Sequence, residues 1–184
     1  MPIIEPLPPD FGPDAPARCH VVLVHPEIPQ NTGNIARLCA GIGGWLHLVS
    51  PFSFSLEDRY LKRAGLDYWP SVRVSVHASL EELEPMLPSD RTWLFTSRAR
   101  GLYSDVQYPG QGSVLVFGCE TRGLPREFVA RWAAHAVRLP TTGDIRSHNL
   151  GNSAAVACYE VVRQSGWRGQ PPAGVELVGP DPEC

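Results

Sequence analysis

LPTTGDIRSHNLGNSAAVACYE, residues 139–160, starts as the end of a strand, crosses a polar loop and continues as a helix that is apolar almost all round. One helix face carries Leu150, Ala154 and Val161, and the other carries Val156 and Tyr159. A helix of this kind is buried on more than one face, and in a chain of 184 residues the second cover is most simply another subunit. The polar loop residues would be costly to bury unpaired, so a polar ligand is expected there.

The rest of the chain alternates between strand-like and helix-like patterns. Strands are expected at residues 20–24, 45–50, 72–77, 91–97, 113–118 and 136–140, and helices at 35–42, 55–65, 79–87, 124–135 and 150–164. This alternation, with short connections, predicts an α/β fold with a parallel sheet covered on both faces. Ligands of such sheets lie beyond the carboxyl ends of the strands, where three polar or glycine-containing loops are expected, at residues 29–34, 118–125 and 141–152.

Composition sets the outer limits of the chain. Proline-rich ends, residues 1–17 and 168–184, are expected to be disordered tails around one domain at 18–167. No apolar run is long enough to span a bilayer and no secretory signal is apparent, so a cytoplasmic location is expected. Five isolated cysteines, without C-x-x-C, argue against zinc and disulfides. The net charge is −3, but residues 18–167 alone have 15 bases and 13 acids, a mildly basic balance of +2.

Two short motifs contain candidate functional residues. In NTGNIAR, residues 31–37, Arg37 is either a guanidinium placed to meet a phosphate or ribose, or a solvated surface residue. In VFGCETRGLP, residues 116–125, Gly118 permits close approach of a backbone or ligand, and Glu120 is either a capping or a functional carboxylate. The sequence has no G-x-G-x-x-G entering a helix, no G-K-[ST] and no G-x-S-x-G, which argues against nicotinamide, nucleoside triphosphate and serine-hydrolase sites.

Three motifs occur together in order: PQNTGNIARLCAGIG (29–43), LVFGCETRGLP (115–125) and the opening stretch (139–160). Together they resemble the SpoU branch of the SPOUT RNA methyltransferases, over nearly all of residues 18–167. HPEIPQNTGN (25–34) and LKRAGLDYW (61–69) are most similar to the minimal single-domain members, which 2′-O-methylate wobble nucleotide 34, a cytidine or uridine, of tRNA-Leu.

The resemblance implies a SPOUT α/β knot, in which the C-terminal part of a parallel sheet is threaded into a deep trefoil knot. It also implies a homodimer with the target ribose between subunits, and a methyl donor, S-adenosylmethionine, bent within the knot. Its implied contacts are Phe95, Thr96, Gly118, Glu120, Leu139, Ser147 and Leu150. No metal is expected, because a sulfonium methyl is already an activated electrophile.

The resemblance further implies catalytic roles. Arg37 assists the 2′-hydroxyl, and the site is arranged by Asn31, Glu120, Ser147 and Asn149. Because guanidinium is a hydrogen-bond donor only, we expect Arg37 to orient the hydroxyl and a neighbouring phosphate rather than act as a base. Two positions depart from the family pattern, His148 where an apolar residue is usual and Gly151 where serine is common. The tRNA is expected to contact basic residues Arg59, Lys62, Arg63, Arg98, Arg122 and Arg146.

Two other functions stay open from the sequence. The first is 2′-O-methylation at another tRNA or ribosomal RNA position, although such relatives usually carry an added RNA-binding domain. The second is a dimeric, non-catalytic RNA-binding knot protein with a degenerate site. The presence of Arg37, Gly118, Ser147 and Asn149 argues against the second function.

Overall fold

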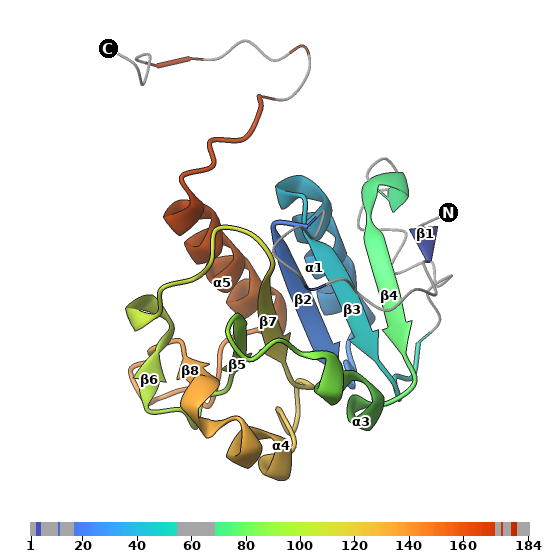
Figure 1. Ribbon diagram of the computed structural model, residues 1–184, viewed down its shortest axis with the longest axis vertical. Helices are drawn as coiled ribbons and strands as arrows, with labels where there is room; N and C mark the ends of the chain where they lie inside the picture. Colours follow the sequence, from blue (N-terminus) through green and yellow to red (C-terminus); the bar gives the residue numbers. More distant parts are fainter. Residues whose placement is uncertain are drawn as a thin grey trace.

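The computed structural model describes residues 3–4, 11, 17–54, 69–171, 174 and 178–179. Within this part of the chain one sheet of eight strands has the order β1-β4-β3-β2-β7-β5-β8-β6, and each paired strand runs parallel to its neighbour (Figure 1). The strands are β1 (Ile3–Ile4), β2 (Cys19–Val24), β3 (Trp45–Val49), β4 (Arg73–His77), β5 (Thr92–Phe95), β6 (Gly101–Leu102), β7 (Ser113–Phe117) and β8 (Ala136–Arg138). The predicted α/β class and parallel sheet are confirmed.

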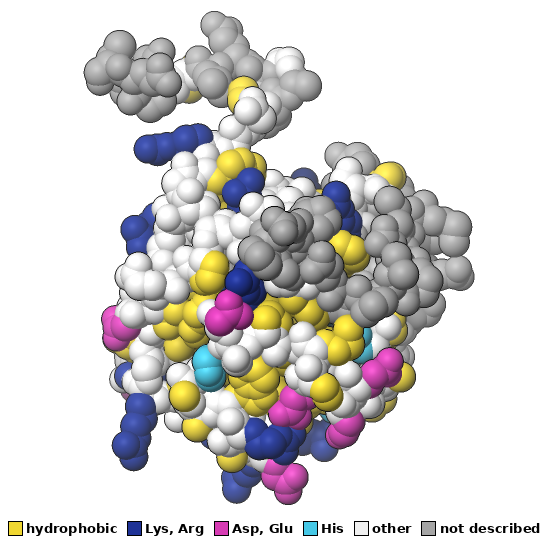
Figure 2. Space-filling model, viewed as in Figure 1, with side chains coloured by type: hydrophobic (Ala, Val, Ile, Leu, Met, Phe, Trp, Pro, Cys, Tyr) yellow, Lys and Arg dark blue, Asp and Glu magenta, His cyan; other side chains and the backbone are white. Residues whose placement is uncertain are grey.

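Both faces of the sheet are covered, as a parallel sheet requires. Side chains alternate along β2, so Val21 and Leu23 join one apolar cluster while Val22 and Val24 join the other. Figure 1 shows α1 and α5 behind the sheet and α3 and α4 nearer the viewer. Figure 2, seen from the same side, shows apolar side chains in the middle of this face and charged side chains towards its lower edge.

The helices begin and end at residues suited to those places. α1 (Pro29–Ile42) has proline in its first turn and ends at Gly43, whose φ is 67°. α3 (Leu80–Leu83) is capped by Ser79 and tightens into a 3₁₀ turn, Glu84–Met86, at Pro85. α4 (Arg126–Arg131) is followed by the 3₁₀ turn Ala133–His135, and α5 (Leu150–Ser165) begins after Asn149 and ends at Gly166. Two further 3₁₀ turns occur at Trp69–Ser71 and Tyr103–Asp105.

The expected loop at residues 29–34 was wrong, because α1 already begins at Pro29. Asn, Thr and Gly in succession favour a turn when read locally. In the structure Asn31, Thr32 and Gly33 are buried in the first turns of the helix, and hydrogen bonds donated to Glu120 of the 118–124 loop hold the start of that helix. Tertiary contacts therefore override the local preference.

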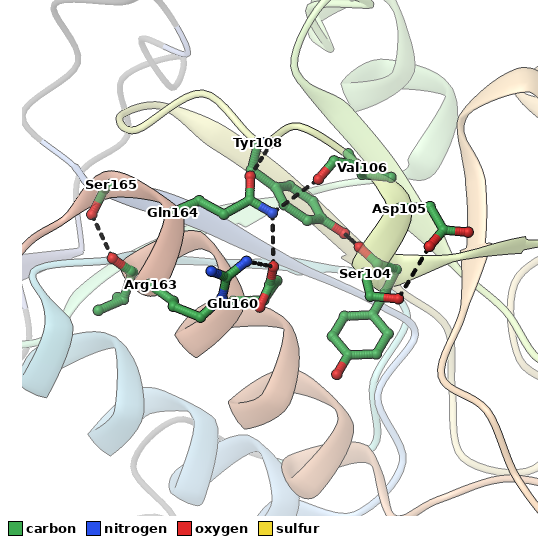
Figure 3. A network of polar contacts seen from close by, with 10 residues as sticks. Ser104, Asp105, Val106, Tyr108, Glu160, Arg163, Gln164 and Ser165 are labelled. Atoms are coloured by element: carbon green, nitrogen blue, oxygen red, sulfur yellow. Dashed lines mark hydrogen bonds and ion pairs between the residues drawn. The ribbon is translucent and has the colours of Figure 1, made fainter.

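The connection from β5 to β7 takes an outward path around β8. It leaves β5, pairs with the outer side of β8 as β6, and returns to β7 beside β2. The end of α5 holds the returning segment (Figure 3): the Gln164 amide accepts a hydrogen bond from the Tyr108 N–H at 2.8 Å and donates to the Val106 carbonyl at 2.9 Å. Gln164 also donates to Glu160 at 2.7 Å. One side chain thus satisfies two backbone groups of the connection.

Three buried histidines, His20, His47 and His77, lie on the neighbouring strands β2, β3 and β4. Their ring nitrogens lie 2.9 Å apart between His20 and His47 and 3.1 Å apart between His47 and His77. Phe11, which is 5% exposed, packs its ring against His20 and His47. Phe11 and β1 both come from residues 1–17, so two parts of this segment contribute to the described fold, and the sequence analysis anticipated neither.

Some predictions fall outside the described residues. These are the helix at residues 55–65, the 61–69 motif apart from Trp69, and the basic residues Arg59, Lys62 and Arg63. Among the helices that are described, none combines the length and apolarity that a bilayer crossing demands.

Candidate active site

A cavity of about 340 Å³ lies at the carboxyl ends of β5, β7 and β8, where the sequence analysis expected a ligand. Nine of the ten predicted site residues line it: Asn31, Phe95, Thr96, Gly118, Glu120, Leu139, Ser147, Asn149 and Leu150. They come from four segments that are far apart in the sequence. The parallel sheet brings them together because its strands end at one edge.

The inner wall of the cavity is apolar. The rings of Phe95 and Phe117 stack with centroids 4.8 Å apart, and Leu124, Leu139 and Leu150 complete the lining. Phe95 ends β5 and Phe117 ends β7, and both are buried. Such a wall suits a flat apolar group such as a purine ring, with polar groups at the rim to fix its orientation.

The loop after β7 folds back tightly on Gly118. The Gly123 N–H donates to the Cys119 carbonyl at 2.9 Å, and Gly123 has a positive φ of 70°, a conformation that favours glycine. A Cβ on Gly118 would lie 2.6 Å from the Gly123 oxygen and closer still to the Gly123 carbonyl carbon and the Leu124 nitrogen. Only glycine fits here without displacing the loop, and residues 118–120 and 122–124 line the cavity.

Glu120 joins this loop to the start of α1. Its carboxylate accepts hydrogen bonds from the backbone N–H of Glu27 at 2.9 Å, from the backbone N–H of Ile28 at 3.2 Å and from Asn31 Nδ2 at 2.8 Å. A carboxylate with three N–H donors is committed to positioning, and the start of α1 is a favourable place for its charge. Glu120 therefore holds residues 27–31 at the start of α1, and its role in the reaction stays a prediction.

Glu27 forms a second link between the start of α1 and the loop after β7, and the sequence analysis missed this residue. Its carboxylate accepts hydrogen bonds from the Thr121 backbone N–H at 3.0 Å and from Thr121 Oγ1 at 2.8 Å. These hydrogen bonds from Thr121 lower the pKa of Glu27. An acid just before the start of α1 was the available signal, because such residues commonly bind nearby backbone N–H groups.

Asn149 links α5 to the same network. Its Nδ2 donates to Asn31 Oδ1 at 3.0 Å, while its Oδ1 accepts from the Asn152 N–H at 3.2 Å and so caps α5. Arg146, in the same loop, donates to the Thr121 carbonyl at 2.7 Å. The three sequence motifs are thus joined by side-chain hydrogen bonds at the rim of the cavity.

Arg37 is the predicted site residue that the structure leaves outside the cavity. It is exposed on the third turn of α1, on the same outward stripe as Asn34. Its expected role beside the 2′-hydroxyl stays a prediction.

The two departures from the family pattern lie at the rim. His148 lines the cavity, is exposed, and has Nε2 3.1 Å from the Pro140 carbonyl. At Gly151 a Cβ would meet Asn149 Oδ1 at 3.2 Å, which would crowd the cap of α5. Within the described residues no group of three or more His, Cys, Asp or Glu side chains is arranged to hold a metal ion.

Comparison with known proteins gives one consistent family. The SpoU rRNA Methylase family matches residues 18–159. A curated relative from Methylovorus glucosotrophus (strain SIP3-4), a tRNA (cytidine(34)-2′-O)-methyltransferase, is 48% identical over 150 residues, which cover 81% of this chain and 97% of the relative.

Solved structures agree with this match. One, described as structural insights into the 2-OH methylation of C/U34 on tRNA, is 42% identical with a TM-score of 0.75, and the match covers 82% of this chain and 97% of the other. The SpoU methyltransferase AviRb from Streptomyces viridochromogenes, in complex with the cofactor AdoMet, shares the fold at 22% identity, with a TM-score of 0.70 and coverage of 82% and 58%.

Proposed function

This chain belongs to the SpoU rRNA Methylase family, and from that membership we propose that it transfers a methyl group from S-adenosylmethionine to the 2′-oxygen of nucleotide 34, a cytidine or uridine, of tRNA-Leu. The observation that carries the proposal is the joining of three distant motifs by Glu120, Asn31 and Asn149 at the mouth of one cavity. The 40–48% identity to relatives named for nucleotide 34 supports the choice of position.

The cavity fits the methyl donor. Phe95, Phe117, Leu139 and Leu150 offer an apolar wall for an adenine ring, and the loop at Gly118 brings main-chain groups close without a side chain in the way. Ser147, Thr96 and Asn149 provide hydroxyl and amide groups at the rim for the ribose and amino-acid parts. When bound, S-adenosylmethionine supplies an activated methyl group on a sulfonium with a neutral leaving thioether.

The residues of this chain then have mainly a positioning task. Holding the 2′-oxygen in line with the methyl group supplies roughly 7–11 kcal/mol through orientation. Glu120 fixes Asn31, and Asn31 fixes Asn149, so the amide groups at the rim are held in place from both sides. Ser147, next to this network in the sequence, lies on the exposed loop from which the ribose would be approached.

We propose that a homodimer completes the site. On α5, Val156 is 41% exposed and Tyr159 57% exposed, one turn apart on the outward face. Such apolar exposure beside a ligand site is typical of an interface. α1 packs against α5 on the same side of the sheet, and its exposed stripe carries Arg37. A twofold contact over these helices would bring Arg37 of one subunit towards the partner's ribose site, where its guanidinium would orient the 2′-hydroxyl and a phosphate.

We also propose that the C-terminal part of the sheet is knotted. The support is the path described above: β8 lies between β5 and β6, so the connection from β5 through β6 to β7 passes around it. The chain leaving β8 crosses back to α5, which packs on β7 and β2. Gln164 of α5 then grips the returning connection. A threaded chain would follow this path, and the knot we propose would be an exception to the rule that connections do not thread loops.

The test is to incubate the protein with methyl-labelled S-adenosylmethionine and unmodified tRNA-Leu, and to map the labelled nucleotide. We expect label on the ribose of nucleotide 34. Label at another position would favour a different RNA target, and RNA binding without any label would favour the non-catalytic alternative. We expect this reaction to take place in the cytoplasm, where tRNA is modified and used.

A further inference from the structure

A second cavity, of about 500 Å³, adjoins the cavity proposed for the methyl donor, which we call the donor cavity. It is lined by His25, Arg98, Cys119, Arg122, Gly123, Leu124, Pro125, Arg126 and Arg146. Six of these residues, all except His25, Pro125 and Arg126, also line the donor cavity. The loop after β7 is therefore shared by the two cavities. We refer to the second cavity as the cationic pocket.

The residues that line the cationic pocket are basic or uncharged, while Glu27 and Glu81 lie outside the lining and interact electrostatically with Arg122 and His25. Four guanidinium groups and an imidazole line it, and none of its described lining residues is a carboxylate. Arg98 donates to the Arg122 carbonyl at 3.1 Å and Arg146 donates to the Thr121 carbonyl at 2.7 Å. Because a guanidinium has five N–H donors, these two contacts hold the loop and leave further donors for a ligand. Like charges gathered at one cavity favour binding of an anion.

Arg122 and Arg126 are exposed, and neither forms an ion pair with any residue that the structure describes. Arg131, five residues after Arg126 on α4, provides the contrast, because Glu84 holds it in an ion pair. Figure 2 shows charged side chains of both signs at the lower end of the molecule, where Figure 1 places α4. The absence of acids is thus a feature of the pocket lining and not of this whole end of the molecule.

His25 adds an observation of a different kind. It has a φ of 54°, a conformation that is uncommon for residues other than glycine and that is found preferentially at ligand sites. Its backbone N–H donates to the Val49 carbonyl at 3.0 Å, which holds the residue at the end of β2. The strained backbone directs the chain so that this side chain lines the cationic pocket.

We propose that the cationic pocket binds a phosphodiester group of the RNA beside the nucleotide that is methylated, with His25 and Arg126 as specific contacts. This inference rests on the proposed function. A planar guanidinium binds two phosphate oxygens at once, and a single-stranded loop presents one such charge per nucleotide. The methyl donor has a single carboxylate, which Arg98 or Arg146 can meet within the donor cavity. His25 and Arg126 line only the cationic pocket and are left for a second anion.

The test compares Arg126→Gln and the double variant Arg126→Gln/His25→Asn with the wild type. Asparagine tolerates the positive φ at position 25. We measure tRNA-Leu affinity across a series of salt concentrations, together with donor affinity by calorimetry. Arg126→Gln is expected to weaken tRNA binding about 10-fold and to make the slope of log affinity against log salt shallower by about 0.7, as for one phosphate of a single strand. The double variant is expected to lose more, and donor affinity is expected to stay at the wild-type value.

The matched control is Arg131→Gln, which removes the same charge from the same helix outside both cavities, and it is expected to leave the slope unchanged. Unaltered tRNA affinity and slope in both pocket variants would overturn the inference. A loss of donor affinity would overturn it as well, because the pocket would then serve the donor. If inorganic phosphate binds in the pocket of the wild type while Arg126→Gln keeps the wild-type affinity for tRNA, the pocket binds the free ion and the inference is contradicted. A wild-type protein that shows the salt dependence and the variant effects without labelling nucleotide 34 would support the pocket and contradict the proposed function.

Discussion

Replacing Gly118 with alanine would displace the loop on which both cavities depend. The new Cβ would lie 2.6 Å from the Gly123 oxygen and nearer to two other backbone atoms. Ordinary contacts begin at about 3.5 Å, so the loop at residues 119–124 must move by more than about 1 Å. Backbone atoms cannot rotate away as a flexible side chain can, so we expect a loss of about 1–3 kcal/mol in the free energy of unfolding.

The same displacement moves Glu120, and through it Asn31 and Asn149. A 1 Å misplacement in a site costs on the order of 100-fold in rate, so methyl transfer by Gly118→Ala is expected to fall by about that factor. Urea unfolding and single-turnover methylation measure the two effects. Gly41→Ala is the control: this helical glycine has no atom within 4 Å of its Cβ position, and alanine there is expected to stabilise the protein by about 0.4–1 kcal/mol. If Gly118→Ala kept wild-type stability and rate, the account of this loop would be refuted.

Two further predictions concern the stability of the fold. Gln164→Ala leaves the Tyr108 N–H and the Val106 carbonyl without their side-chain partner, so the free energy of unfolding is expected to fall by about 1–3 kcal/mol; an unchanged urea midpoint would contradict the proposed grip of α5 on the β6–β7 connection. Burial, and then the neighbouring His20 and His77, holds the pKa of His47 well below its ordinary value of 6.5. The unfolded chain therefore binds the proton more readily, so stability is complete above pH 6.5 and falls as the pH drops below it, with a limiting slope of about 1.4 kcal/mol per pH unit for each such histidine. Urea unfolding between pH 7.5 and 5 should show this fall, and a shallower one in His47→Gln; equal slopes would contradict it.

Four strands, β2, β3, β5 and β7, could be predicted because each is a largely apolar run that the sheet buries on both faces. β4 was predicted from its alternating pattern and is buried only in part. The expected strand at 113–118 differs from β7 only by its last residue, Gly118. Short edge strands were not foreseen, since two residues such as Gly101–Leu102 carry no periodic signal and depend on the partner strand. The prediction of where α1 starts was wrong for the opposite reason, because a strong local turn signal at Asn31–Gly33 is overridden by hydrogen bonds that residues 27–31 donate to Glu120.

Gly118 was singled out from its motif, whereas Phe95 and Leu139 were named only through the family resemblance; all three line the cavity. The hydrogen bonds between site residues could not be predicted, because pairs such as Glu27 and Thr121 are 94 positions apart in the sequence. Arg126 and His25 were missed for the same reason. Neither belongs to a pattern that signals a ligand, and the fold brings the residue after β2 and the first residue of α4 to the lining of one pocket.

The central claim is that the three motifs enclose a methyl donor and share it across a twofold axis. The most direct measurement is a crystal structure of the protein with S-adenosylmethionine. The account predicts the donor in the cavity between Phe95, Gly118 and Leu150, with Arg37 of the neighbouring subunit facing the Ser147 side of the site. A donor bound elsewhere, or an Arg37 distant from Ser147 in both its own and the neighbouring subunit, would contradict it.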